Sequence, residues 1–179
     1  MTLRWSHAVL YVRHLAPMID FYGTVLGFEV SDRGPVDPAH PGLEVAFLSQ
    51  VATDHHQLAL VPVRGDEPPT TVDHLAFRVE SLGEVKALAE RITADGRASG
   101  LHAMNHGNAW SVYFRDPEGN GLEVFCDSPW HVQQPQGKPW DLAMSEEALR
   151  RQTEEQFGGE PGFEPIEAFY ARRRARTGE

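Results

Sequence analysis

The sequence predicts an α+β fold in which two βαβββ modules pair about a pseudo-twofold axis, followed by a C-terminal extension. The order strand, helix, strand, strand, strand occurs twice, over about 4–64 and about 71–128, which is an internal repeat. His7 and His74 lie near the start of the two opening strands, 67 positions apart. We therefore expect one domain over 1–128, with a cupped sheet around a shared cavity, and an extension over 129–179.

The elements of the first module follow from residue patterns. Runs rich in β-branched and aromatic residues predict strands at 5–13, from 28 onward, at 43–48 and at 56–63. Apolar residues at helical spacing predict a helix over 15–26, with Gly27 as its C-cap. Glycine and proline predict a loop over 34–42, and prolines with charges predict a connector over 64–70.

The second module repeats this order. It has a strand at 72–79, a helix at 82–92, a short run at 97–103 and a hairpin whose two arms flank the turn 116–121. In the second arm, Glu123 and Phe125 alternate with Leu122, Val124 and Cys126, so the carboxylate and the packed thiol occupy opposite faces. A carboxylate on a strand face beside a Phe calls for a cation.

Composition excludes several classes of function. Of 179 residues 41% are hydrophobic, and sixteen basic against twenty-six acidic residues give a net charge of -10, which disfavours nucleic acid and anionic membranes as partners. No apolar run approaches the roughly 18 residues of a membrane span, and the N-terminus lacks a signal-peptide core. The single cysteine excludes an intramolecular disulfide, so we expect a cytoplasmic protein, and a homo-oligomer.

The register of the repeat points to a metal site. Adding 67 to His56 gives Glu123, so the halves offer the pairs His7/His74 and His56/Glu123, which converge if the halves pack about a twofold axis. Two imidazoles and a carboxylate suit non-haem Fe(II), which makes His7, His74 and Glu123 the expected ligands. His56 is then a fourth ligand or an acid/base group. Taken singly, a strand histidine is more often a packed or surface residue than a ligand.

The hairpin carries a resemblance to a known superfamily. Residues 113–123 contain the turn pattern D-P-x-G-N-x-x-E, and each half opens with a histidine. In these features residues 5–128 resemble the vicinal oxygen chelate proteins, which include glyoxalase I, fosfomycin and bleomycin resistance proteins and extradiol ring-cleavage dioxygenases. The turn pattern is specific for the superfamily and says little about the reaction.

Finer features resemble the single-domain type I extradiol dioxygenases. Residues 55–60, His-His-Gln-Leu-Ala-Leu, resemble the strand whose second histidine is the catalytic acid/base in those enzymes, which is His56 here. Tyr113, ten residues before Glu123, matches their active-site tyrosine in type and spacing. The resemblance implies insertion of both atoms of O2 into a catechol-type aromatic, such as a 2,3-dihydroxybiphenyl-like substrate, at Fe(II), with Mn2+, Ni2+ or Zn2+ as alternatives.

One position departs from the resemblance. The family often has an active-site histidine nine residues before the tyrosine, where this chain has Met104. His106 is the nearby candidate to replace it, and an exposed loop histidine is the alternative. For Tyr113 the alternative is a tyrosine packed in the core.

Two other functions stay open. One is a metal-dependent glyoxalase-like isomerase or lyase, and the other is a non-catalytic small-molecule binding or resistance protein. The resemblance implies that His56 and Tyr113 separate the dioxygenase from the isomerase, and glyoxalase I carries Glu or Gln where His56 stands. A complete His/His/Glu set argues against the non-catalytic protein.

The remaining histidines and the extension carry weaker signals. His14, His40 and His131 are expected to be exposed, His102 is undecided, and Asp73 faces away from His74. In the extension, Ser145 predicts the start of a helix, and 165–174 a second helix. The extension then covers the pocket mouth, packs on a second subunit or stays partly disordered.

Overall fold

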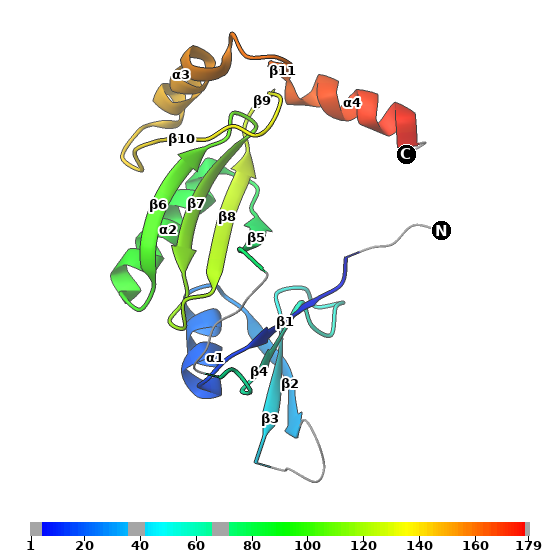
Figure 1. The fold of residues 1–179 in the computed structure, drawn as a ribbon, viewed down its shortest axis with the longest axis vertical. Coiled ribbons are helices and arrows are strands. Elements are labelled where there is room, and N and C mark those ends of the chain that lie inside the picture. Colours follow the sequence, from blue (N-terminus) through cyan, green and yellow to red (C-terminus); the bar gives the residue numbers. More distant parts are fainter. Residues whose placement is uncertain (1–4, 36–41, 66–71, 178–179) are drawn as a thin grey trace. The chain divides into compact units, whose positions relative to one another are not determined.

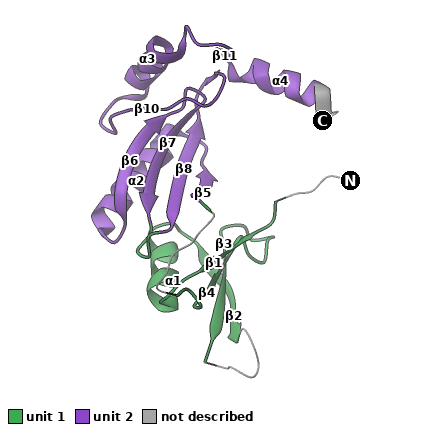
Figure 2. Cartoon of the chain, viewed as in Figure 1, with its two compact units in different colours: residues 1–72, 116–119 green, residues 73–115, 120–179 purple. Residues whose placement is uncertain are grey.

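The structure is a computed structural model, and it describes residues 5–35, 42–65 and 72–177. The chain divides into two compact units, shown in different colours in Figure 2: residues 1–72 with 116–119, and residues 73–115 with 120–179. Each unit contains one predicted module, except that the turn 116–119 belongs to the first unit. His40 and most of the predicted connector over 64–70 lie outside the described residues.

The first unit is a four-stranded sheet with one helix (Figure 1). Its elements are β1 (Ala8–Tyr11), α1 (Leu15–Thr24), β2 (Glu29–Pro35), β3 (Glu44–Ser49) and β4 (Leu58–Val61). The sheet order is β1-β4-β3-β2, with β1 parallel to β4 and the other pairs antiparallel. The helix buries its apolar stripe, which includes Met18, Phe21 and Tyr22. This unit therefore has an apolar core of its own.

The second unit repeats the arrangement with longer strands. Its module consists of β5 (Leu75–Arg78), α2 (Leu82–Asp95), β6 (Ser99–Asn105), β7 (Ala109–Arg115) and β8 (Gly121–Asp127). The sheet order is β10-β6-β7-β8-β5, with β5 parallel to β8. Ser81 and Glu84 form a capping box at the start of α2, and Gly96 ends it in the left-handed conformation, which glycine adopts without steric cost. The crossover helix is thus specified at both ends by local sequence.

The predicted α+β class and the order of elements in both modules are confirmed. The pseudo-twofold pairing concerns the placement of the units and stays a prediction. Some boundaries differ, because His7 and His74 each lie immediately before a strand and His56 lies two residues before one. Strand β2 also continues through Pro35, into the predicted loop.

The extension packs on the second unit. Strand β9 (Trp130–His131) pairs with β11 (Glu164–Pro165), and β10 (Lys138–Pro139) pairs with β6. Helix α3 (Glu146–Phe157) begins at the predicted N-cap Ser145, whose hydroxyl accepts from the amide of Ala148, and α4 (Ile166–Thr177) is the second predicted helix. The predicted exposure of His131 is wrong, because its ring stacks on Phe169 with centroids 3.6 Å apart.

The hairpin turn gives helix α1 its N-terminal cap. The Glu118 carboxylate accepts from the amides of Arg13 and His14 at 2.7 Å, while the side chain of the N-cap residue His14 makes no capping bond. In the same turn, Asp116 is buried and accepts from the hydroxyl of Tyr22 at 3.1 Å. Burial and the Asp116 charge hold the pKa of Tyr22 well above its usual value. Residues 116–118 therefore stabilise the first unit by satisfying a helix end.

We predict that Glu118→Ala lowers the free energy of unfolding by about 1–2 kcal/mol, because it leaves the amides of Arg13 and His14, just ahead of α1, without a carboxylate acceptor. Urea denaturation followed by circular dichroism measures the change. The control is Glu90→Ala, an exposed position on α2, where the change should stay within about 0.5 kcal/mol. Equal effects of the two substitutions would contradict the proposed cap.

We also predict that Cys126 does not react with a thiol reagent in the folded protein. Its side chain is buried as expected from strand alternation, and burial followed by the Asp127 charge raises the pKa of the thiol to about 12. At about pH 8.5 an ordinary cysteine is half thiolate, whereas Cys126 stays protonated. Colorimetric titration should find no reactive thiol in the native protein and one in denaturant. Fast reaction in the native protein would show that this face of β8 is open.

Candidate active site

The first unit brings His7 and His56 together. The two residues precede the parallel strands β1 and β4, whose starting ends lie side by side, and the ring centroids are 4.3 Å apart. Ser6 Oγ lies 3.0 Å from Nδ1 of His7, which leaves Nε2 of that ring available. On its other side His56 contacts Phe47, with centroids 4.9 Å apart. The first unit thus offers two neighbouring imidazoles.

His56 is electrostatically disposed to be neutral. Burial, followed by repulsion from His7 and His55, lowers the pKa of its imidazole below the ordinary value. Its Nδ1 lies 3.0 Å from Nδ1 of His55, so one of the two nitrogens donates to the other. In the tautomer in which His56 donates, Nε2 carries the free lone pair and can accept a proton.

The constant offset of 67 does not hold for His56. Ala8 pairs with Leu58 in the first unit and Leu75 pairs with Leu122 in the second, so the first strands are offset by 67 positions and the last strands by 64. The residue equivalent to Glu123 is therefore Ala59, and the predicted equivalence of His56 and Glu123 is wrong. His56 lies ahead of the strand, on the segment that joins β3 to β4.

The second unit brings His74 and Glu123 together. In the parallel ladder Ala76 pairs with Glu123, and His74 is two residues earlier on the same face. Nε2 of His74 lies 3.1 Å from Oε2 of Glu123, and the Glu123 side chain is only 10% exposed. Nδ1 of His74 lies 2.6 Å from Oδ2 of Asp73. The expectation that Asp73 faces away from His74 is wrong, because both residues lie ahead of β5, where strand alternation is not enforced, and the Asp73 carboxylate contacts the ring of its neighbour.

Tyr113 lies on β7, the central strand of the five-stranded sheet, and has neighbours on both adjacent strands. In the ladders it is directly opposite His102 on β6 and Glu123 on β8. Its ring stacks on His102 at 5.4 Å and meets the edge of His74 at 5.3 Å. Burial, followed by the interaction with Glu123, raises the pKa of its hydroxyl far above the ordinary value. Tyr113 therefore keeps its proton, and because it is half-buried and lines the pocket, the alternative of a tyrosine packed in the core does not hold.

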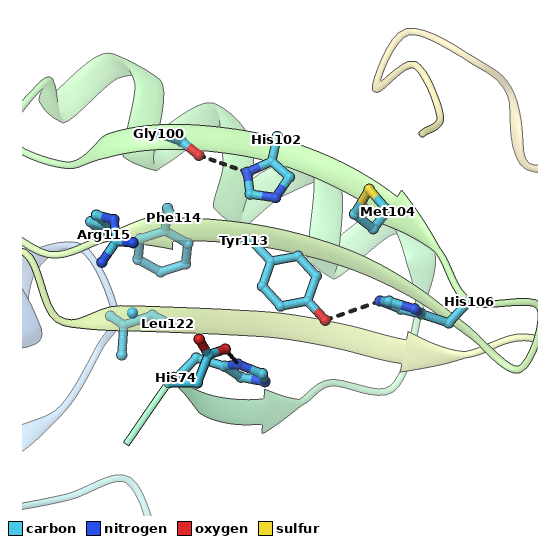
Figure 3. Close-up of a pocket in the computed structure, with 11 residues that line it drawn as sticks. His74, Gly100, His102, Met104, His106, Tyr113, Phe114, Arg115 and Leu122 are labelled. Carbon is cyan, nitrogen blue, oxygen red and sulfur yellow. Dashed lines mark hydrogen bonds and ion pairs between the residues drawn. The ribbon is translucent and has the colours of Figure 1, made fainter. Parts of the chain in front are cut away.

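His106, not Met104 at the family's usual histidine position, is the residue that contacts the Tyr113 hydroxyl. The Nε2 atom of His106 lies 3.0 Å from the Tyr113 hydroxyl, an interaction marked by a dashed line in Figure 3. The ring is half-buried rather than exposed in a loop. His102, Met104 and His106 alternate along one face of β6 and its end, which also explains why all three line the same pocket. The pattern His-x-Met-x-His could have identified His102, which the sequence left undecided.

These residues surround a pocket of about 360 Å3 within the second unit (Figure 3). This volume is in the range of small-molecule sites. Its polar lining includes His74, His102, His106, Tyr113 and Arg115, and its apolar lining includes Met104, Phe114 and Leu122.

Comparison with known proteins identifies the family. A family model described as the Glyoxalase/Bleomycin resistance protein/Dioxygenase superfamily matches residues 4–124. The chain belongs to this superfamily.

Two relatives in sequence carry dioxygenase or catechase names. The chain is 27% identical over 144 residues to Metapyrocatechase of Pseudomonas sp. (strain CF600), covering 77% of this chain and 44% of the relative. It is 31% identical over 134 residues to Biphenyl-2,3-diol 1,2-dioxygenase 3 of Rhodococcus globerulus, covering 72% of this chain and 65% of the relative. The chain therefore spans less than two thirds of the length of either relative.

A solved structure supports the fold. The chain is similar to the fosfomycin resistance protein FosX from Listeria monocytogenes, complexed with Mn(II) and sulfate, with a TM-score of 0.53 and 23% identity. The match covers 72% of this chain and 95% of FosX. At this level of identity the likeness shows the superfamily fold alone.

The pair His74 and Glu123 fits a metal ion. Two donor atoms about 2.1 Å from one ion, and at right angles, lie about 3 Å apart, which is the separation of these two donors. In metal sites the second ring nitrogen of a ligating histidine is commonly bonded to a carboxylate, as Nδ1 of His74 is to Asp73. The superfamily includes metal-containing members, and the donor chemistry of this chain agrees with that.

The described residues do not complete a site within either unit. Over residues 5–35, 42–65 and 72–177 no three of His, Cys, Asp and Glu are grouped so as to hold an ion. Each unit contributes a pair, and the convergence of the pairs stays a prediction.

None of the helices in these ranges is long and apolar enough to cross a membrane.

We predict that Asp73→Asn weakens divalent metal binding about 10- to 100-fold, because the amide no longer orients and polarises the His74 ring as the carboxylate does. Anaerobic titration calorimetry with Fe(II) or Mn(II) measures the affinity. Asp95→Asn, which alters an ion pair with Arg97 at the end of α2, is the control and should leave the affinity unchanged. Equal affinities for all three proteins would show that Asp73 does not support the site.

Proposed function

We propose that this protein is an extradiol ring-cleavage dioxygenase, which inserts both atoms of O2 into a catechol-type aromatic at a non-haem Fe(II) centre. The observation that carries the proposal is the contact of His56 with His7, since it sets an acid/base imidazole beside a candidate ligand. The dioxygenase names of the two relatives in sequence support it.

The proposed ligands are His74 and Glu123, together with His7. When bound there, Fe(II) supplies a positive centre that both catechol oxygens and dioxygen can reach, which lowers the pKa of the catechol hydroxyls. Two imidazoles and one carboxylate are the donor set that leaves open positions on iron. The chain supplies the rest of the chemistry through proton transfer and orientation.

His56 is the proposed acid/base residue. Its lowered pKa keeps the imidazole neutral near pH 7, so Nε2 can accept a proton from a substrate hydroxyl. The same atom later returns the proton to the oxygen that leaves during ring opening. A group that takes and returns one proton must titrate close to the working pH, as an imidazole does.

Tyr113 and His106 are the proposed orienting residues. The raised pKa of Tyr113 keeps a neutral hydroxyl in the pocket, where its oxygen can accept a hydrogen bond from a substrate hydroxyl without adding charge. His106 holds that hydroxyl at 3.0 Å, from two positions beyond the residue where the family often has its histidine. His102 stacks on the ring of Tyr113 and keeps the phenol from rotating out of place.

The test is anaerobic reconstitution with Fe(II), followed by O2 and either catechol or 2,3-dihydroxybiphenyl, while the yellow ring-opened product is recorded. We predict that the unmodified protein forms the product and that His56→Ala lowers kcat about 10²- to 10⁴-fold, with iron still bound. His14→Ala, an exposed imidazole whose ring caps nothing, is the control and should retain activity.

Two outcomes would contradict the proposal. If no catechol in a panel gives colour and the protein binds Ni2+, Zn2+ or Mn2+ instead, it is a glyoxalase-like isomerase or lyase. If metal analysis finds no ion bound under any loading condition, a non-catalytic binding or resistance protein is the better description.

A further inference from the structure

The C-terminal extension runs directly beside His106. Strand β10 pairs with β6 at Met104 and Asn105, and the amide of Trp140 donates to the carbonyl of Ala103. Just ahead of β10, a Cβ on Gly137 would lie 3.2 Å from Cε of Met104, so the backbone passes close over this face. The extension thus packs against two residues that line the pocket, Met104 and His106.

Helix α3 anchors the same region from the other side. The hydroxyl of Thr153 accepts from Nδ2 of Asn105 at 2.9 Å and from Nε1 of Trp110 at 3.0 Å. All three residues are buried. A buried polar network of this kind fixes the end of β6 and the start of β7, between which His106 is placed.

Two hydrogen bonds from the extension act on His106 itself. The carbonyl oxygen of Gln136 lies 2.6 Å from Nδ1 of the ring, and Nε2 of Gln134 donates to the backbone carbonyl of His106 at 2.7 Å. The amide of His106 donates to the carbonyl of Ala109 at 2.9 Å. Apart from Nε2, the polar atoms of His106 are therefore occupied by bonds that hold the residue in place.

The bond to Gln136 also fixes the tautomer of the ring. A backbone carbonyl can only accept, so Nδ1 of His106 must carry the hydrogen. In the neutral ring Nε2 is then an acceptor, and the Tyr113 hydroxyl, 3.0 Å away, is the group that donates to it. The carbonyl of Gln136 thus determines that Tyr113 donates and His106 accepts in the hydrogen bond between them.

This direction matters because Tyr113 has one proton and two acceptors in reach. Glu123 lies directly opposite Tyr113 in the ladder and interacts with its hydroxyl, and His106 lies on the other side. If the proton points to Glu123, it occupies a lone pair of the carboxylate. If it points to His106, both oxygens of Glu123 remain available to a cation.

We propose that Gln134 and Gln136 of the extension are positioning residues for the candidate active site. They hold His106 as the Nδ1–H tautomer, so that it accepts the Tyr113 proton and leaves the Glu123 carboxylate free for a cation. The oxygen of Tyr113 then presents its lone pairs to the pocket, where it accepts a hydrogen bond from a hydroxyl of the substrate. The kinetic part of this inference rests on the proposed function, while the tautomer does not.

The first experiment reads the tautomer in the unmodified full-length protein. Long-range nitrogen–proton NMR of the histidine rings, with His106 assigned by comparison with His106→Gln, distinguishes Nδ1–H from Nε2–H. We expect Nδ1–H for His106 in the folded protein, whether or not a substrate is known. Finding Nε2–H would overturn the proposal.

The second experiment is a double-mutant cycle. Gln134→Ala removes the bond to the His106 carbonyl and should lower kcat about tenfold to a hundredfold through misplacement of the ring, with KM little changed. Gln133→Ala, one residue earlier with an exposed side chain, is the matched control and should stay within about twofold. In a His106→Gln background, Gln134→Ala should have no further effect, because its action passes through His106.

The outcomes separate this inference from the proposed function. If no catechol is cleaved but His106 is the Nδ1–H tautomer and becomes a mixture of tautomers in Gln134→Ala, the positioning role stands and the proposed reaction fails. If catechol is cleaved but Gln134→Ala lowers the rate equally with and without His106, the extension acts only through general stability and the inference is wrong.

Discussion

Glu123 is a carboxylate on an interior strand of the five-stranded sheet of the second unit, and the placement of its neighbours depends on it. An ionised group so little exposed costs several kcal/mol unless cationic or hydrogen-bonding groups surround it. His74, immediately before β5, and Tyr113 on β7 lie on either side of β8. The parallel pairing of β5 with β8 is what requires the crossover through α2. The topology of this unit thus sets an imidazole and a phenol hydroxyl beside the Glu123 carboxylate.

The sequence predicted the parts of this arrangement that depend on side-chain alternation. Strand period alone places Glu123 on the opposite face from Cys126, and Cys126 is buried as that pattern requires. Capping residues marked the start of α3, and helical spacing marked α1 and α2. The motif over 113–123 pointed to the superfamily because glycine and proline at fixed positions specify the turn. Each of these signals is local in the chain.

The registers of the parallel pairs β1–β4 and β5–β8 could not be predicted from such local signals. A constant offset between repeats assumes equal loops, whereas the segment that joins β3 to β4 and the β7–β8 turn differ in length. The difference removes His56 from the strand position that holds Glu123 in the second unit. The proposed roles require such a separation, since a metal ligand must keep its lone pair on the ion while an acid/base group must exchange protons. The resemblance to extradiol dioxygenases implies a role for His56 distinct from that of a ligand, which the repeat arithmetic alone did not distinguish, and this role stays a prediction.

The substitution of the family's usual histidine by Met104 shows why the extension was not predictable. His106 and Met104 share a face of β6, so a shift of two residues keeps the imidazole on the pocket side but carries it beyond the end of the strand. There the sheet no longer fixes its orientation, and other groups must do so. Gln134 and Gln136 provide these bonds from a segment without helical or strand periodicity, which no pattern in the sequence marks as functional. A histidine moved off a strand thus requires a support from elsewhere in the chain, and in this protein the extension is that support.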